Sequence, residues 1–338
     1  METGIERIND YVLNVSHDIH YWMVRTMGGD FYQDFIKGDF IAIGYNEIPL
    51  KDIESINLED QTAINQLRKK VNEIYQPARP GHIVSQLLRF CKQINVGDVI
   101  VLPGHSSFEV SLCRVKGKVY EEHDIDNQLN ECQFIKRIPI EVVRTTTRLA
   151  LPPKAQLMFG SRHPISSIDD YATYIDNSMM DFYEKDQEVH LVLHVESERD
   201  ISTSTFYGLQ NIFEVVKCFC KENTIEYKED DVTIKVQMES PGLLHFISEN
   251  QNILYFIGLV ILLLNGGGLK IDNEIFKLHL HTDGLISKMS DFLDRRIDRK
   301  IKESIQKSLD KMKIKTPEDF KNAIATLLEK INDRRNNY

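Results

Sequence analysis

Cysteine is scarce in this sequence and is not arranged as it would be in a metal site. The five cysteines are scattered along the chain and include no Cys-x-x-Cys pair, which argues against a disulfide framework and a zinc knuckle. The opening stretch METGIERINDYV lacks the basic and apolar regions of a signal peptide. We therefore expect a protein of the reducing cytoplasm.

Long hydrophobic runs are also missing. The longest, Ile253 to Leu264, has polar neighbours on both sides, and a helix of about 12 residues rises only about 18 Å against a hydrocarbon layer of about 30 Å. The run predicts a buried core helix, so a membrane partner is not expected. A membrane-perturbing element over 243–264 is the alternative.

Familiar catalytic motifs are absent as well: there is no P-loop, dinucleotide fingerprint or Gly-x-Ser-x-Gly. Glu226, Lys228 and Asp231 contain part of a nuclease pattern, but no apolar-flanked Asp lies a hairpin upstream. His279 and His281 alternate along a strand-like segment and could share a metal, although such alternation is also typical of a half-exposed strand. The sequence thus identifies no catalytic residue, metal site or cofactor, and a divergent metal-dependent nuclease remains the alternative class.

Positive charge is outnumbered in the chain as a whole. The net charge of -10 excludes a protein that coats nucleic acid through bulk charge. Residues 61–118 differ, because their nine basic and three acidic residues give a local charge of +6. This segment predicts a local face for phosphate groups, and an ordinary solvated face is the alternative.

Strand-like segments separated by turns make up the first half. Residues 20–26 and 39–45 are rich in aromatic and β-branched residues, and a short helix is expected between them at 30–37. Short strands with inserted helices predict a small β-barrel. Further helices are expected at 58–74 and 82–94, and further strands in NVGDVIVLPG, EVSLCRVKGKVY and QFIKRIPIEVVRT.

The second half has a different pattern. Strands and helices alternate as β-α-β-α-β, in the order 188–197, 203–222, 231–239, 253–264 and 275–282. After Gly284 the chain is dense in charges at helical spacing and predicts two or three helices. The fold class expected is therefore α+β, with a barrel followed by a sandwich-type domain.

The order of motifs in the first half resembles the PUA-like and EVE-like barrel modules of modification-dependent restriction enzymes and other prokaryotic defence proteins. The motifs are Trp22-x-Val24-Arg25, GDFIAIGY, a helix from Gly81 to Phe90, GDVIVLPG and VKGKVY, over about residues 18–160. The resemblance implies a pocket that accepts a nucleobase, often a modified one flipped from a duplex. Such a pocket needs flat side chains for stacking and polar groups for the base edge.

The resemblance suggests which residues would form that pocket. Trp22, Tyr45 and Arg25 have the right side chains for its wall. Core packing is the alternative role for Trp22 and Tyr45, and a surface or salt-bridged strand position is the alternative for Arg25. Edge or phosphate contacts are expected from five further residues: His82, Gln86, Arg89, His105 and Ser106.

These observations predict a cytoplasmic nucleic-acid-binding protein, with DNA favoured over RNA, that senses or responds in prokaryotic defence. The charged C-terminal helices suggest a homo-oligomer. The expected divisions are a barrel at 1–165, a linker helix at 166–186, an α+β interaction or effector domain at 187–284 and a helical region at 285–338.

Overall fold

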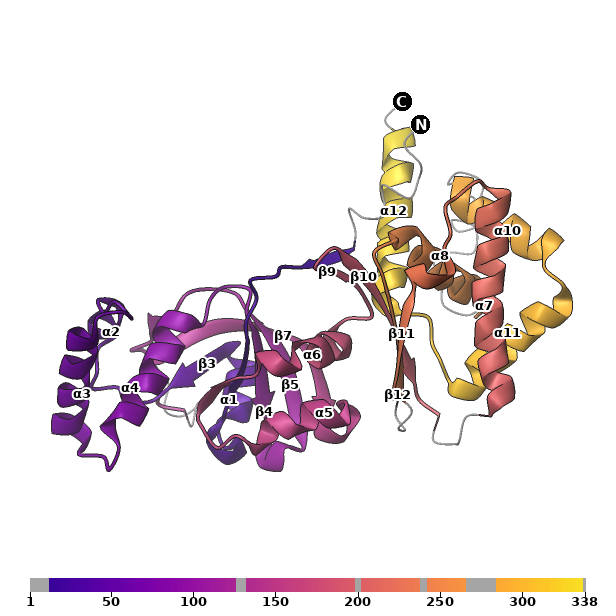
Figure 1. Cartoon of the computed structure of the whole chain (residues 1–338). Helices are drawn as coiled ribbons and strands as arrows, with labels where there is room; N and C mark the ends of the chain where they lie inside the picture. The colour runs from indigo at the N-terminus through magenta and orange to yellow at the C-terminus, as the bar shows by residue number, and fades with distance from the viewer. Residues whose placement is uncertain (1–11, 126–131, 198–201, 238–241, 266–283, 337–338) are drawn as a thin grey trace. The chain divides into compact units, whose positions relative to one another are not determined.

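The computed structural model describes residues 12–125, 132–197, 202–237, 242–265 and 284–336 (Figure 1). The chain divides into two compact units, one of Asp18–Met179 and one that joins Met1–His17 to Met180–Tyr338. The boundary therefore lies past the predicted position 165. The stretch 166–186, predicted as a linker helix, contains a helix of the first unit, α6 (Ala172–Met179), and a strand of the second, β9 (Phe182–Lys185). In the described part of the chain, no helix is long and apolar enough to cross a membrane.

The Asp18–Met179 unit is built on one curled sheet of seven strands with helices inserted among them (Figure 1). The strand order is β3-β7-β5-β4-β2-β8, β6 pairs with β7, and only β2 and β4 run parallel. The strands are β2 (Tyr21–Val24), β3 (Phe40–Ile43), β4 (Val99–Pro103), β5 (Glu109–Val115), β6 (Tyr120–Glu121), β7 (Lys136–Thr147) and β8 (Ile165–Ser167). The small β-barrel predicted from the sequence is thus a curled sheet, with β3 and β8 at the two ends of its strand order, and β6 is separate from β5.

Helices cover both faces of this sheet. Alternate residues of β2 point to opposite faces, so Trp22 and Val24 join a core with side chains of α1 to α4, whereas the Tyr21 hydroxyl donates to Asp176 of α6 at 2.6 Å. The helices are α1 (Tyr32–Lys37), α2 (Leu50–Glu54), α3 (Gln61–Tyr75), α4 (Pro80–Leu88), α5 (Pro153–Gln156) and α6 (Ala172–Met179). The helices predicted at 30–37, 58–74 and 82–94 are confirmed as α1, α3 and α4, and a π-helical turn at Arg89–Gln93 continues α4.

The second unit contains a five-stranded sheet in the order β1-β9-β10-β12-β11. Its strands are β1 (Leu13–Val15), β9 (Phe182–Lys185), β10 (Glu188–Val195), β11 (Thr233–Gln237) and β12 (Gly242–Ser248). Because β1 pairs with β9, Leu13–Val15 belongs to the second unit, whereas the sequence had placed residues 1–165 together in the predicted barrel. The predicted strand at 275–282 lies outside the described residues, and β12 was not expected.

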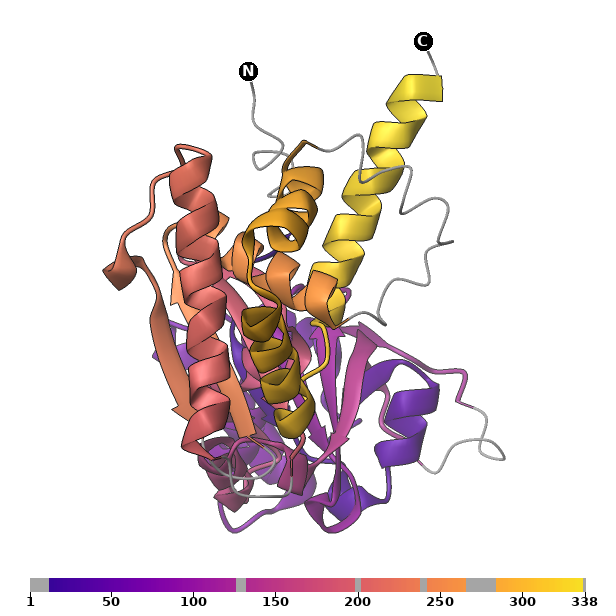
Figure 2. The same ribbon diagram turned by 90° about the vertical axis from the view of Figure 1, so that its right-hand side faces the viewer.

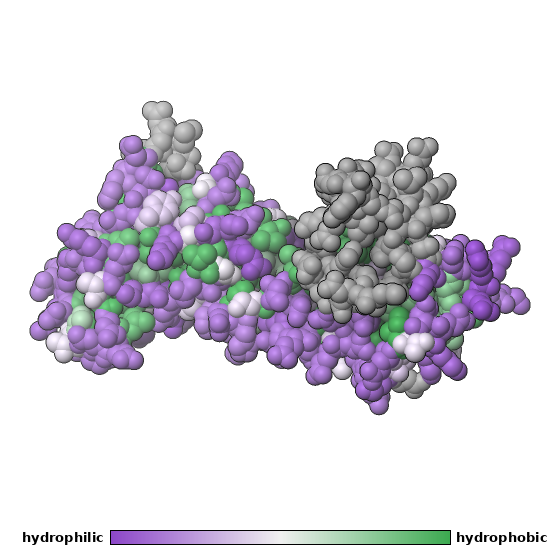
Figure 3. Space-filling view, turned by 90° about the horizontal axis from the view of Figure 1, so that it is seen from above, coloured by the Kyte–Doolittle hydropathy of each residue, from purple (hydrophilic) through white to green (hydrophobic). Residues whose placement is uncertain are grey.

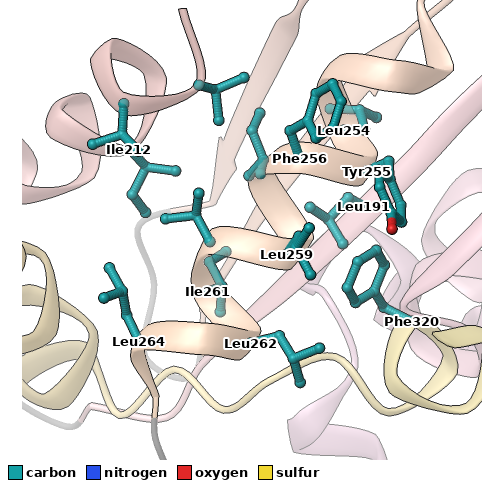
Figure 4. Packing of buried hydrophobic residues seen from close by; sticks show 14 of the residues in the cluster. Leu191, Ile212, Leu254, Tyr255, Phe256, Leu259, Ile261, Leu262, Leu264 and Phe320 are labelled. Atoms are coloured by element: carbon teal, nitrogen blue, oxygen red, sulfur yellow. The ribbon is translucent and has the colours of Figure 1, made fainter. Parts of the chain in front are cut away.

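Helices gather on one face of the five-stranded sheet, as Figures 1 and 2 show. They are α7 (Thr203–Glu222), α8 (Gln251–Leu264), α10 (Gly284–Arg296), α11 (Arg299–Met312) and α12 (Glu318–Asn336). Two or three charged helices were expected after Gly284, and the structure has three there, α10, α11 and α12. The apolar run 253–264 is confirmed as a core helix, because α8 packs against Leu191, Ile212 and Phe320 from three other elements (Figure 4).

The burial of α8 predicts the effect of a charge in that helix. Ile257 is 1% exposed, and an unpaired buried carboxylate has no compensating partner there. We expect Ile257→Asp to lower the free energy of unfolding by more than about 4 kcal/mol and to unfold this unit. A matched control is Tyr207→Asp on α7, where the side chain is 67% exposed. Urea titration of both variants tests this, and equal melting of the two would contradict it.

Two histidines buried in the same sheet predict a dependence on pH. His190 Nδ1 lies 2.9 Å from His245 Nε2, and the His190 ring stacks on Tyr183 at 4.5 Å between centroids. Burial lowers the pKa of His190 to about 4 and that of His245 to about 3. Below pH about 6.5 the unfolded chain takes up protons that the folded chain does not. Stability should therefore fall as the pH drops from about 6.5 to about 4.

Comparison with His190→Gln isolates this effect, because glutamine keeps a hydrogen-bonding side chain that does not titrate. Asp181 acts in the opposite direction, since burial and the neighbouring Asp319 raise its pKa to about 7. Its stabilising protonated form is lost as the pH rises from about 4 to about 7. Unfolding free energies at several pH values should show a weaker loss on acidification in the variant than in the wild type.

Candidate nucleic-acid interface

Several strand ends of the Asp18–Met179 unit meet at one end of its sheet. Val24 at the end of β2 pairs with Ile165 at the start of β8, and Pro103 at the end of β4 pairs with Val110. Glu109 at the start of β5 pairs with Thr147 at the end of β7. The connecting residues 25–30, 104–109 and 148–164 therefore lie at the same end, and we call them the rim.

Two turns of the rim have strained backbone and pack closely together. Met27, Ser106 and Ser107 have φ values of 52°, 53° and 55°, which is uncommon for residues with a Cβ. Gly29 has a φ of 116°, and a Cβ on it would lie 2.5 Å from the His105 Cα. Such outliers cluster at functional sites, which directs attention to this end of the sheet.

Arg25 holds one side of the rim in place. Its Nη2 donates to the carbonyl of Phe159 at 2.7 Å and its Nε to that of Ser161 at 3.1 Å. Burial, and then the neighbouring Arg148, lower the pKa of the Arg25 guanidinium. Among the described residues, neither arginine has a carboxylate within 4.0 Å. Two close cations without a counter-ion favour the binding of an anion.

The longest segment of the rim has basic residues and no acidic ones. Residues 148–164 include Arg148, Lys154 and Arg162 and no Asp or Glu, whereas the two shorter segments contain Asp30 and Glu109. Because the chain as a whole has a net charge of -10, this stretch is a local region of positive charge on an acidic protein. The phosphate face predicted from the sequence, at residues 61–118, does not include this stretch.

Large apolar side chains are exposed on the same rim. Met27, Phe108, Leu149 and Leu157 are 60%, 64%, 70% and 67% exposed. The Phe108 carbonyl accepts a hydrogen bond from the Arg148 N–H at 2.9 Å, so the exposed ring and the guanidinium belong to adjacent backbone. The Arg148 Cζ lies 5.2 Å from the centre of the Phe159 ring. Figure 3 shows apolar and polar surface interspersed on this unit. An exposed ring beside cations suits a base and its phosphate.

Trp22, which the sequence analysis placed in the wall of a base pocket, lies in the core. Its ring is 5% exposed, and its indole N–H donates to Asp98 at 2.9 Å. The same carboxylate accepts from the backbone N–H groups of His20 and Asn95. Since the ring has no open face, the structure supports the alternative role, core packing with a satisfied N–H.

Gln86 and Arg89 contact backbone, where base-edge or phosphate contacts were expected. The Gln86 side-chain oxygen accepts from the Ile165 N–H at 2.7 Å, and Arg89 donates to the Ile165 carbonyl at 3.1 Å. Gln86 is only 2% exposed. The two side chains thus satisfy both backbone groups of an edge-strand residue, as a neighbouring strand would.

Tyr45 does not share a wall with Trp22 and Arg25. It follows β3, whose last residue, Ile43, pairs with Lys136 at the start of β7, which is the end of the sheet opposite the rim. Its ring packs edge-on against Tyr75, with 5.4 Å between centroids.

The other three predicted residues do lie at or beside the rim. His105 and Ser106 are exposed in its second turn. His82, in the first turn of α4, shares a hydrogen bond of 2.9 Å with His163 of the rim. Of the eight residues predicted from sequence, Arg25, His82, His105 and Ser106 therefore gather at one end of the sheet.

The residues considered for a nuclease do not lie on a strand. Glu226 and Lys228 form an exposed ion pair of 2.8 Å in the loop between α7 and β11. His279 and His281 are outside the described residues. In the part of the chain that is described, no group of three potential metal ligands comes together.

Comparisons with known proteins add no relative. No family model matches the chain, and neither does any curated protein or solved structure.

The core position of Trp22 predicts a loss of stability when its ring is removed. We expect Trp22→Ala to lower the free energy of unfolding by about 3–5 kcal/mol through the cavity that it leaves. Trp22→Phe loses the indole N–H and part of the ring volume but keeps an aromatic ring in the core, so it should cost less. Thermal and urea unfolding compare the two variants. A Trp22→Ala protein as stable as the wild type would show that the ring is not part of the core.

Proposed function

We propose that this protein binds nucleic acid at the rim of its Asp18–Met179 unit, which acts as a PUA/EVE-like module. The observation that carries the proposal is the combination, at one end of the sheet, of the exposed Phe108 ring with Arg25 and Arg148. Neither arginine has a carboxylate within 4.0 Å among the residues that the structure describes. Bases stack on aromatic rings and on guanidinium groups, and phosphates are attracted to positive charges.

Charge supports a local contact over an extended one. The chain is acidic overall, so its net field repels a polyanion. A small basic end with apolar side chains can still bind, because the Debye length of about 8 Å at physiological salt screens distant charges. This arrangement suits an unpaired or flipped base better than a long duplex tract. A modified DNA base is the ligand implied by the resemblance of the first half.

The second unit is proposed to assemble the protein into a homo-oligomer or to couple recognition to a response in prokaryotic defence. This setting rests on the family resemblance, and no catalytic residue is assigned. In this proposal α8 has a structural role, as the buried helix around which the second unit packs. It is not the membrane-perturbing element that was the alternative for residues 243–264.

Phe108 offers the sharpest test of the rim. If a base stacks on its ring, Phe108→Ala should weaken binding by about 1–3 kcal/mol, or about 5- to 150-fold in Kd. Stability should change little, because the side chain is 64% exposed. Binding is measured by fluorescence anisotropy with the full-length chain and short single-stranded and duplex DNA and RNA, with and without 5-methylcytosine, at two salt concentrations.

Tyr120→Ala is the matched control for Phe108→Ala. Tyr120 is an exposed aromatic of the same unit, but it pairs with Arg137 near the start of β7, at the end of the sheet opposite the rim. The Tyr120→Ala variant should therefore leave the affinity for nucleic acid unchanged. Arg148→Ala removes a positive charge from the rim, so it should weaken binding most at low salt. Equal effects of Phe108→Ala and Tyr120→Ala, or a wild type that binds none of the probes, would overturn the proposal.

A further inference from the structure

Helix α11 of the second unit presents a row of lysines on one side. Lys300, Lys307 and Lys311 are separated by seven and four residues, so they lie on the same face of the helix. All three are exposed. Lys300 and Lys311 are eleven positions apart, or about 16 Å along the helix.

These lysines are not neutralised by neighbouring carboxylates. Arg299 pairs with Glu303 at 2.6 Å and Lys302 with Asp294 at 3.5 Å, so the ion pairs of α11 use other residues. Within the described residues, none of the three lysines of the row forms an ion pair. Residues 295–315 carry nine basic and three acidic residues, a charge of +6 in a chain of -10. This concentration of charge makes the row a candidate surface for a polyanion.

The opposite face of α11 is occupied by the core. Ile305 and Leu309 are fully buried, and a Cβ on Gly208 of α7 would lie 1.9 Å from the Ser308 hydroxyl, so α7 and α11 are in close contact. The helix therefore has no apolar face to insert into a lipid layer, which an amphipathic membrane helix requires. Its exposed face offers charge alone, and that chemistry matches a phosphate backbone.

We propose that Lys300, Lys307 and Lys311 form a second nucleic-acid contact, which binds the phosphate backbone without reading its bases. The inference rests on the proposed function only in taking nucleic acid as the partner. The row contributes salt-sensitive affinity that is independent of sequence, whereas the rim contributes the base-dependent part.

The triple variant Lys300→Gln, Lys307→Gln, Lys311→Gln tests this surface in the full-length chain. Each phosphate contact contributes about 0.9 to the slope of log K against log salt on duplex DNA. The variant should therefore reduce the slope for a short unmodified duplex by about 2–3, measured between about 50 and 200 mM salt. The difference in affinity between modified and unmodified bases should stay unchanged.

Two controls separate a specific surface from a general change of charge. A second triple variant, Lys221→Gln, Lys235→Gln and Lys288→Gln, removes the same charge from exposed lysines of the same unit that lie outside α11. It should leave the slope nearly unchanged. The corresponding triple arginine variant of the row keeps the charge and should bind as the wild type does. Circular dichroism confirms that each variant folds.

The outcomes distinguish this inference from the proposed function. An unchanged slope in the α11 variant, together with weaker binding by Phe108→Ala, overturns the second contact and leaves the rim proposal standing. A reduced slope with no effect of Phe108→Ala supports the second contact and removes the rim. Binding to anionic phosphatidylserine vesicles but to no nucleic acid overturns the inference in favour of a lipid surface, and binding to neither probe overturns it as well.

Discussion

The rim depends on side chains that take the place of a missing strand partner. Beyond β8 no further strand pairs within the described part of the unit, so the backbone groups of Ile165 would be left at an open edge. Gln86 and Arg89 satisfy both groups, and Arg25 binds the carbonyls of Phe159 and Ser161. Because these bonds come from α4 and from the end of β2, they set the path of residues 159–165. That path places Arg148 and Phe159 together.

A comparable constraint organises the second unit. Helix α8 is apolar on nearly all sides, with eleven buried residues, so it needs cover from every direction. The sheet supplies one side through Leu191, and α7 and α12 supply others through Ile212 and Phe320 (Figure 4). Gly258 permits the contact with α12, because a Cβ there would lie 2.7 Å from the Phe320 ring. Removing any covering helix would expose α8 to water.

Charge is distributed unevenly over both units, and this unevenness links the two proposed contacts. An acidic chain stays soluble and avoids non-specific binding to nucleic acid. The rim contributes basic residues beside exposed apolar side chains, whereas α11 contributes lysines alone. The first combination suits a base with its phosphate, and the second suits a backbone. In Figure 3 the surface of the second unit that is not grey is mostly hydrophilic, in keeping with this difference.

Local periodicity in the sequence determined the helices α3, α4, α7 and α8 and most of the strands, because spacing of 3.6 or 2 residues reports directly on a buried face. It did not indicate β12, nor the pairing of β1 with β9, which joins residues 170 positions apart. Residue type alone suggested Trp22 for a base pocket, yet its hydrogen bond to Asp98, 76 residues away, ties it into the core. The exposure of Phe108 could not be predicted from the sequence, because it depends on which parts of the folded chain cover the ring. Only the tertiary structure brings distant strand ends together, and so only it could define the rim.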